Sequence, residues 1–244
     1  MRLEACGSVS VKCKWEILGK DKQMIRIVVM TAMYLAVMGG LLFGAAGRLD
    51  WPMAWAYLVI LTASTVAVLV LGDREMLLVR AHKEKGARTW DPFLAGVSFL
   101  LFWPGSCVVA GLDYGRLHWS PSIPMPVRLI ALLAFAFGLA FAAWAMLANK
   151  FFAKFVQIQT DREHIVIANG PYAYVRHPGY AGTVLAFISL PVALGSLWAL
   201  LPASVGLSLW VVRTYLEDRT LHKELDGYSR YASRVRWRLI PGIW

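Results

Sequence analysis

The sequence predicts an all-α integral membrane protein with about six transmembrane helices. Of its 244 residues, 58% are hydrophobic and only 16% are charged, and the mean hydropathy is +0.54. Soluble domains carry about one-quarter charged residues, so a chain this apolar needs lipid to cover its surface. The apolar runs follow one another without a long polar linker, which predicts a single membrane domain.

Six apolar runs in the sequence are the predicted helices. The first four have the roughly 20 residues that a helix needs to cross a bilayer core. The last two are shorter and only Gly195 and Ser196 separate them, so they predict a tight helical hairpin. One long broken span, which would reduce the count to five, is the alternative. The runs are Met24 to Ala46, Met53 to Leu71, Pro92 to Leu112, Val127 to Ala148, Tyr180 to Leu194 and Leu197 to Val212.

Basic residues fall almost entirely on one side of these predicted spans. The segments before the first span, after the second, after the fourth and after the sixth hold 22 of the 25 Lys and Arg residues. Because cytoplasmic loops are rich in Lys and Arg, both termini are expected in the cytoplasm, in a bacterial inner membrane. The net charge of +10 is then explained by contact with anionic membrane lipids, and no nucleic-acid binding is expected.

The chain divides into three parts by composition. Residues 1–23 are polar and basic and are expected to form an unstructured extension, residues 24–148 form a scaffold of four helices, and residues 149–244 contain two polar islands. The three cysteines, Cys6, Cys13 and Cys107, lack the spacing of a metal site, so neither a metal nor a disulfide is expected. Nothing in the sequence requires a partner subunit.

The first polar island runs from Asn149 to Gly182 and contains the stretch GPYAYVRHPGYAG. Pro171 and Pro178 each fix a backbone angle and prevent one regular helix through this island. Alternation from His164 onwards predicts a short extended piece that ends in a turn near Gly170. Glycines permit close approach to a bound ligand, so the island has the composition of an ordered loop that lines a binding site.

The second polar island runs from Arg213 to Trp244. On a helix, Arg213 and Glu217 lie on one face, and Leu221 and Leu225 continue that face. One interpretation is a surface helix with an ion pair of little energetic value. The other is a functional pair, because Arg213 directly follows an apolar run and ionisable residues at that depth are often functional.

Taken together, the two islands resemble the isoprenylcysteine carboxyl methyltransferase family. The pattern is G-x-Y-x-x-x-R-H-P-x-Y-x-G, then an apolar hairpin of about thirty residues, then R-x-x-x-E-[DE]-x-x-L and a Y-x-x-Y-x-x-x-V tail that ends in Leu-Ile-Pro. Relatives of that family include bacterial and archaeal membrane methyltransferases and, more distantly, phospholipid methyltransferases. The resemblance covers residues 149–244, which would then be the catalytic region.

The resemblance implies S-adenosyl-L-methionine as the cofactor and a lipophilic small molecule or a lipid-anchored substrate as the methyl acceptor. Arg213 matches the position that binds the carboxylate of the substrate. The chain has Glu217-Asp218 where the family often has two glutamates, which keeps the charge. The implied cofactor-binding residues are Gln157, His164, Ile165, Val166, Ile167, Tyr172, His177, Pro178, Gly179, Tyr180 and Glu217.

The chemistry of these residue types agrees with that implication. A carboxylate such as Glu217 suits a cationic cofactor, and the rings of Tyr172 and Tyr180 can bind its sulfonium or its adenine. No G-x-G-x-x-G pattern follows a strand, so a Rossmann domain is not expected. Methyl transfer to an ionised acceptor needs no proton removal, so no general base is expected. His177 is open to three interpretations: a base, a hydrogen-bond donor to the cofactor, or a structural cap.

Several functions compete at this point. O-methylation of a prenylcysteine-like or isoprenoid carboxylate fits Arg213 best, and methylation of a small thiol or of a phospholipid amine is the alternative. A sterol-type membrane reductase that uses NADPH is another enzyme class, but the first island offers only Arg176 for the extra phosphate. A transporter or scaffold would need ionisable residues deep in the spans, and the spans contain almost none.

Overall fold

The computed structural model describes residues 5–73, 77–78 and 88–244, with side chains from residue 22 onwards. Every regular element in these residues is a helix, so the predicted all-α class is confirmed. The long elements are α1 (Ala5–Ala46), α2 (Pro52–Leu71), α4 (Asp91–Leu100), α5 (Ser106–Leu112), α6 (Met125–Ala148), α7 (Pro178–Leu194), α8 (Leu200–Glu224) and α9 (Tyr228–Arg234). Short π-helical turns at Leu101–Gly105 and Asp113–Leu117 continue α4 and α5, so Asp91–Leu117 is one rod.

Four helices are long and apolar enough to cross a membrane, and they coincide with the first four predicted runs. They are Lys22–Ala46, Pro52–Leu71, Asp91–Leu117 and Met125–Ala148. The chain is therefore an integral, multi-pass membrane protein. An unstructured extension was expected over residues 1–23, but the structure continues α1 back to Ala5, so the first helix is longer than its apolar run.

The predicted hairpin is present as α7 and α8. Gly195 makes the turn between them in the left-handed backbone region, with φ of +87°. Pro178 is the first residue of α7 and Pro171 lies in the first turn of a short 3-10 helix, Gly170–Ala173, so both prolines begin helices. α8 does not stop where its apolar run ends at Val212 but continues to Glu224, which projects its polar half beyond the apolar bundle.

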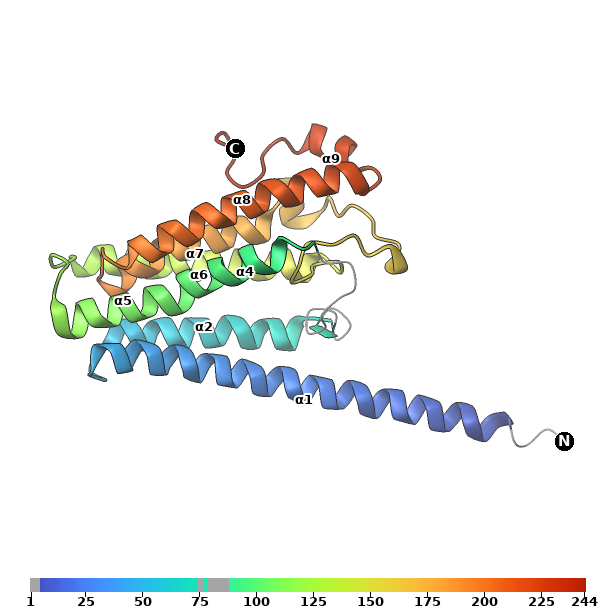
Figure 1. Cartoon of the computed structure of the whole chain (residues 1–244), viewed down its shortest axis with the longest axis horizontal. Helices are drawn as coiled ribbons and strands as arrows, with labels where there is room; N and C mark the ends of the chain where they lie inside the picture. Colours follow the sequence, from blue (N-terminus) through green and yellow to red (C-terminus); the bar gives the residue numbers. More distant parts are fainter. Residues whose placement is uncertain (1–4, 74–76, 79–87) are drawn as a thin grey trace.

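The helices form a bundle in which α1 and α2 lie on one side, α7 and α8 on the other, and α6 and the Asp91–Leu117 rod between them (Figure 1). The start of the rod, the end of α6, the start of α7 and the polar half of α8 all lie at the same end of the bundle (Figure 1). The chain between α6 and α7, residues 149–177, covers that end. The fold therefore brings both polar islands together.

Two glycines allow α6 and α7 to touch through their backbones. A Cβ atom built on Gly182 would lie 2.4 Å from the carbonyl oxygen of Gly138 and 2.6 Å from the amide nitrogen of Ala142. Small residues at such crossings let helices in lipid approach closely. Because Gly182 closes the GPYAYVRHPGYAG stretch, this contact fixes the position of the first polar island against α6.

Replacing Gly182 with alanine should therefore destabilise the bundle, although alanine is the better helix former. We expect Gly182→Ala to lower the free energy of unfolding by about 1–3 kcal/mol through overpacking. Thermal unfolding in detergent checks this. The matched control is Gly96→Ala in α4, where the added Cβ meets nothing within 4 Å and the stability should stay equal or rise. Equal stability of both variants would contradict the backbone contact.

Candidate functional site

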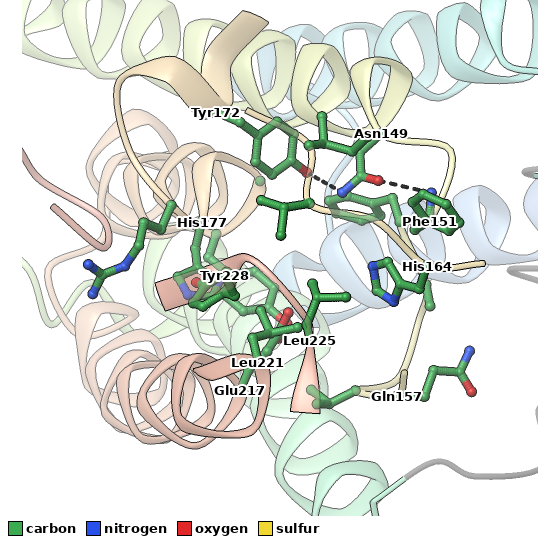
Figure 2. A pocket seen from close by; sticks show the side chains of 18 of the residues that line it. Asn149, Phe151, Gln157, His164, Tyr172, His177, Glu217, Leu221, Leu225 and Tyr228 are labelled. Atoms are coloured by element: carbon green, nitrogen blue, oxygen red, sulfur yellow. Dashed lines mark hydrogen bonds between the residues drawn. The ribbon is translucent and has the colours of Figure 1, made fainter. Parts of the chain in front are cut away.

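A pocket lies at the end of the bundle where the two polar islands meet. Its walls come from residues 149–157 and 164–167, the start of α7, the polar half of α8, and α9. Tyr172, Asn149 and Phe151 lie across the cavity from Glu217, Leu221 and Tyr228 (Figure 2). The cavity encloses about 110 Å³, less than the roughly 300 Å³ at the low end of ligand pockets. A nucleoside-sized ligand would therefore move some wall side chains as it enters.

Nearly all the site residues predicted from the sequence line this pocket. Pro178 does not line it and instead starts α7, where its missing N–H costs nothing. The predicted residues that line the pocket are Gln157, His164, Ile165, Val166, Ile167, Tyr172, His177, Gly179, Tyr180, Arg213 and Glu217. Residues almost sixty positions apart along the chain thus share one cavity.

Arg213 is buried and already has a carboxylate partner, Asp91 at the start of α4. Its Nε donates to Asp91 Oδ1 at 2.5 Å and its Nη2 donates to Asp91 Oδ2 at 3.1 Å. Nη2 also donates to the carbonyl oxygen of Lys154 at 3.0 Å, and the hydrogen bonds of Arg213 seen in the described part of the chain all come from Nε and Nη2. The rings of Tyr180 and Trp210 lie about 5 Å from the guanidinium, at 5.1 and 5.0 Å. Arg213 is thus held rigidly with one nitrogen still available.

Glu217, unlike Arg213, has no oppositely charged partner among the described residues. It lines the pocket, it is half-buried, and its carboxylate accepts a hydrogen bond from the hydroxyl of Tyr180. Among the described residues it has no salt bridge, whereas the buried carboxylates Asp91 and Asp218 each have at least one arginine partner. A carboxylate left without a cation inside a pocket is an acceptor for a positively charged ligand.

Asp218, the next residue along α8, lies outside the pocket lining and joins four segments. Its two oxygens accept hydrogen bonds from Arg176 Nε at 2.9 Å, His177 Nε2 at 3.2 Å, Tyr228 Oη at 2.8 Å and Arg238 Nε at 2.8 Å. Burial would raise the pKa of this carboxyl group, but the hydrogen bond and charge of His177 and the bonds from Tyr228 and Arg238 outweigh it and hold the pKa well below 3.8. Asp218 is therefore ionised at neutral pH.

The contact with Asp218 favours a structural role for the ring of His177. An ionised carboxylate only accepts hydrogen bonds, so Nε2 of His177 carries a hydrogen and donates it. The backbone nitrogens of Arg176 and His177 donate to the carbonyl oxygens of Trp237 and Arg238, both at 2.9 Å. The imidazole also stacks on Tyr180, with ring centroids 5.7 Å apart. His177 thus links the tail to the pocket wall while its ring faces the cavity.

The wall opposite α8 is built by residues 149–167. His164 stacks on Phe151 with ring centroids 4.5 Å apart, and its Nδ1 accepts from the backbone nitrogen of Gln159 at 3.4 Å. Burial, and then the charge of Arg162, lower the pKa of His164, so its imidazole is neutral at pH 7. Residues 164–168 are neither helix nor strand, and the predicted turn follows at Gly170. This wall is apolar and aromatic.

The sequence analysis identified some residues in and around the pocket and missed others. Leu221 and Leu225 were placed on the face of Arg213 and Glu217, and both do line the pocket. Asp91 carried no signal, because it lies at the start of an apolar run and meets Arg213 across 122 positions of the chain. The aromatic residues after α6 could have been found from the sequence, because they form a cluster directly after an apolar run. Arg176, Tyr228 and Tyr231 belong to the quoted motif but were given no binding role, and the other lining residues not assigned to the site include Asn149, Phe151, Phe152, Phe155 and Val156.

The fold and the pocket define a membrane-embedded helical protein with a partly aromatic pocket at one end of its bundle. Comparison with known proteins agrees: residues 127–226 match the phospholipid methyltransferase family. The protein-S-isoprenylcysteine O-methyltransferase of Dictyostelium discoideum is 28% identical over 155 residues, which cover 60% of this chain and 59% of that protein. The chain is thus similar to isoprenylcysteine and phospholipid methyltransferases, in agreement with the resemblance of the two polar islands.

A solved structure has the same fold. It is the eukaryotic intramembrane Ras methyltransferase, an isoprenylcysteine carboxyl methyltransferase, with a TM-score of 0.53 and 16% sequence identity. The match covers 100% of this chain and 88% of that one. The similarity extends beyond residues 149–244 to the helices that the sequence analysis treated as scaffold.

Removing the charge of Asp218 should destabilise the contact between the C-terminal tail and the pocket wall. Asp218→Asn leaves Arg176 and Arg238 without their carboxylate, which costs about 3–5 kcal/mol in comparable buried pairs. Thermal unfolding in detergent measures the loss, and Asp226→Asn, an exposed site two residues beyond α8, is the control. A similar, small effect of both changes would contradict the role given to Asp218.

The same carboxylate should make the fold acid-sensitive. Because its pKa is lower in the folded state than in the unfolded chain, its contribution to stability is present above about pH 4 and is lost as the pH falls further. The wild-type chain should therefore lose more stability between about pH 5 and pH 3 than Asp218→Asn does. Parallel pH profiles of the two proteins would contradict this assignment.

Proposed function

We propose that this protein is an integral-membrane methyltransferase that uses S-adenosyl-L-methionine and transfers the methyl group to a lipophilic acceptor. The observation that carries the proposal is Glu217, a half-buried carboxylate without a salt bridge in the described chain, inside an aromatic pocket. The similar proteins described above are methyltransferases, and this suggests the reaction type. Both termini are placed at the cytoplasmic face of a bacterial inner membrane in this proposal.

The residues present fit such a cofactor. Glu217 offsets its positive charge, and the faces of Tyr172, Tyr180 and Phe151 provide the electron-rich surfaces that cations and adenine favour. Gln157 is buried at the pocket wall and offers an amide to the polar part of a nucleoside. His164, neutral at pH 7, adds no opposing charge. When bound, S-adenosylmethionine would supply a methyl group on a positively charged sulfur: the acceptor's ionised nucleophile would bond to the methyl carbon as the carbon–sulfur bond breaks, and the sulfur would leave as a neutral thioether.

The chain's own contribution is orientation and exclusion of water. The buried pair of Arg213 and Asp91 fixes the guanidinium beside the ring of Tyr180 at the pocket wall, where Nη1, which is not used by Asp91, would orient an anionic acceptor. Apolar walls weaken the hydration of that anion, which raises its reactivity towards a cation. Holding both reactants in line can contribute on the order of 7–11 kcal/mol. A carboxylate acceptor, such as a prenylcysteine or an isoprenoid acid, suits Arg213 best.

The test is to incubate membranes that contain the protein with labelled S-adenosylmethionine and three classes of acceptor: prenylcysteine carboxylates, small thiols and phospholipid amines. Label on the carboxylate class supports the proposal in full. Label on the phospholipid amine alone would retain the methyltransferase and replace its substrate, in line with the family matched by residues 127–226. Binding of NADPH without binding of S-adenosylmethionine to the purified protein would overturn the proposal.

Loss of the Glu217 charge should weaken cofactor binding selectively. Glu217→Gln keeps the side-chain shape and should raise the dissociation constant for S-adenosylmethionine by roughly 10- to 100-fold, because a charge-assisted contact is lost. Calorimetric titration of the purified protein gives this constant. Asp161→Asn, an exposed carboxylate in the same polar region, should leave it unchanged. Equal affinity of Glu217→Gln and wild type would rule out this role.

The role of Arg213 is best tested by a substitution that keeps its charge. Arg213→Lys retains a cation for Asp91 but loses the planar group that can hold one carboxylate and offer Nη1 to another. KM for a carboxylate acceptor should rise by roughly tenfold or more, with little change in cofactor affinity. Arg219→Lys, exposed on the same helix, is the control. An unchanged KM would remove Arg213 from acceptor binding.

A further inference from the structure

The C-terminal segment after α9 exposes large apolar side chains that the bundle does not cover. Trp237, Ile240 and Ile243 are 37%, 44% and 75% exposed. The segment is nevertheless well ordered internally, because Arg238 and Leu239 donate backbone hydrogen bonds to the carbonyl oxygen of Trp244 at 2.8 and 3.1 Å. A compact turn with an outward apolar surface needs something to cover that surface.

The position of this segment relative to the apolar bundle is defined by α8. After α9 the chain runs back alongside α8 towards the middle of the molecule (Figure 1). The guanidinium of Arg238 lies 6.0 Å from the ring of Tyr215, and Tyr215 is three residues, or roughly 4.5 Å of helix, beyond the apolar run that ends at Val212. The segment therefore lies at the level where the apolar surface of the bundle gives way to its polar end.

The charge of the segment is entirely positive. Residues 228–244 contain four arginines and no Asp or Glu. Arg238 is neutralised by Asp218, whereas Arg230, Arg234 and Arg236 are exposed and have no salt bridge in the described part of the chain. Apolar side chains beside unpaired arginines, at the edge of a bilayer, are the pattern of an interfacial anchor.

We infer that residues 234–244 dock on the cytoplasmic surface of the membrane and bind anionic lipid headgroups. Ile240 and Ile243 enter the boundary between headgroups and acyl chains, Trp237 lies at the headgroup level that tryptophan prefers, and Arg234 and Arg236 contact the anionic headgroups. The anchor is continuous with the pocket wall, since Trp237 and Arg238 accept the backbone hydrogen bonds of Arg176 and His177. Docked lipid would thus hold that wall in place.

The position of the anchor can be measured without any assay of activity. In the full chain with Cys6→Ser and Cys13→Ser, Ile243→Cys carries an environment-sensitive fluorophore; Cys107 is fully buried and should not react. The protein is reconstituted in nanodiscs of phosphatidylcholine alone or with phosphatidylglycerol. We expect the probe at position 243 to report a less polar site, and to be quenched by lipid-borne nitroxide, when phosphatidylglycerol is present and the salt concentration is low. A probe at Asp226→Cys, beyond the end of α8, should remain in water in both lipids.

Charge variants separate headgroup binding from simple apolar contact. The pair Arg234→Gln and Arg236→Gln should lower the ratio of docked to free anchor by roughly tenfold or more in phosphatidylglycerol nanodiscs. The matched pair Lys22→Gln and Arg26→Gln removes the same charge from exposed positions of α1 and should leave the ratio unchanged. A probe at position 243 that stays in water in both lipids would overturn the inference and point to an acidic protein as the occupant. Methyltransferase activity plays no part in this readout, so failure of the proposed function would leave it intact.

Discussion

The carboxylate of Asp218 is the contact on which the arrangement of the site depends. It accepts hydrogen bonds from the first polar island, from α9 and from the C-terminal tail, while it belongs to α8 itself. The first polar island, which precedes the hairpin, therefore meets α8, α9 and the tail at one charge. Because burial of a carboxylate is costly unless its lone pairs are all satisfied, this joint is favourable only when every partner is in place. The contacts of Asp218 therefore form cooperatively and hold the pocket wall together.

The distribution of charge around the pocket follows from this arrangement. Asp91 neutralises Arg213, and Asp218 neutralises Arg176 and Arg238. The arginines that surround the cavity are therefore compensated within the fold, and Glu217 is left to give the cavity its net negative character. The proposed binding of a cationic cofactor and an anionic acceptor would need this separation, because an uncompensated arginine beside the cofactor would oppose its binding.

Much of this fold could be predicted from the sequence, because long apolar runs have few alternatives in a membrane. The ends of α2, α6 and α7 fall within two residues of the predicted runs. The pocket residues were found because they are concentrated in two polar islands. Asp218 was not understood, since the sequence treats Glu217 and Asp218 as an equivalent pair. On a helix, adjacent side chains point about 100° apart, so Glu217 faces the pocket and Asp218 faces the tail.

The bond between Asp91 and Arg213 has a consequence for how such proteins can be recombined. Asp91 lies on α4, within the half of the chain that carries neither polar island, and it also accepts the backbone nitrogen of Val156 at 2.7 Å. A chimera that joined residues 149–244 to the helices of another membrane protein would bury a guanidinium without its counter-ion. The apolar half of the chain is therefore as much a part of the site as the two polar islands, because it supplies the counter-ion of Arg213.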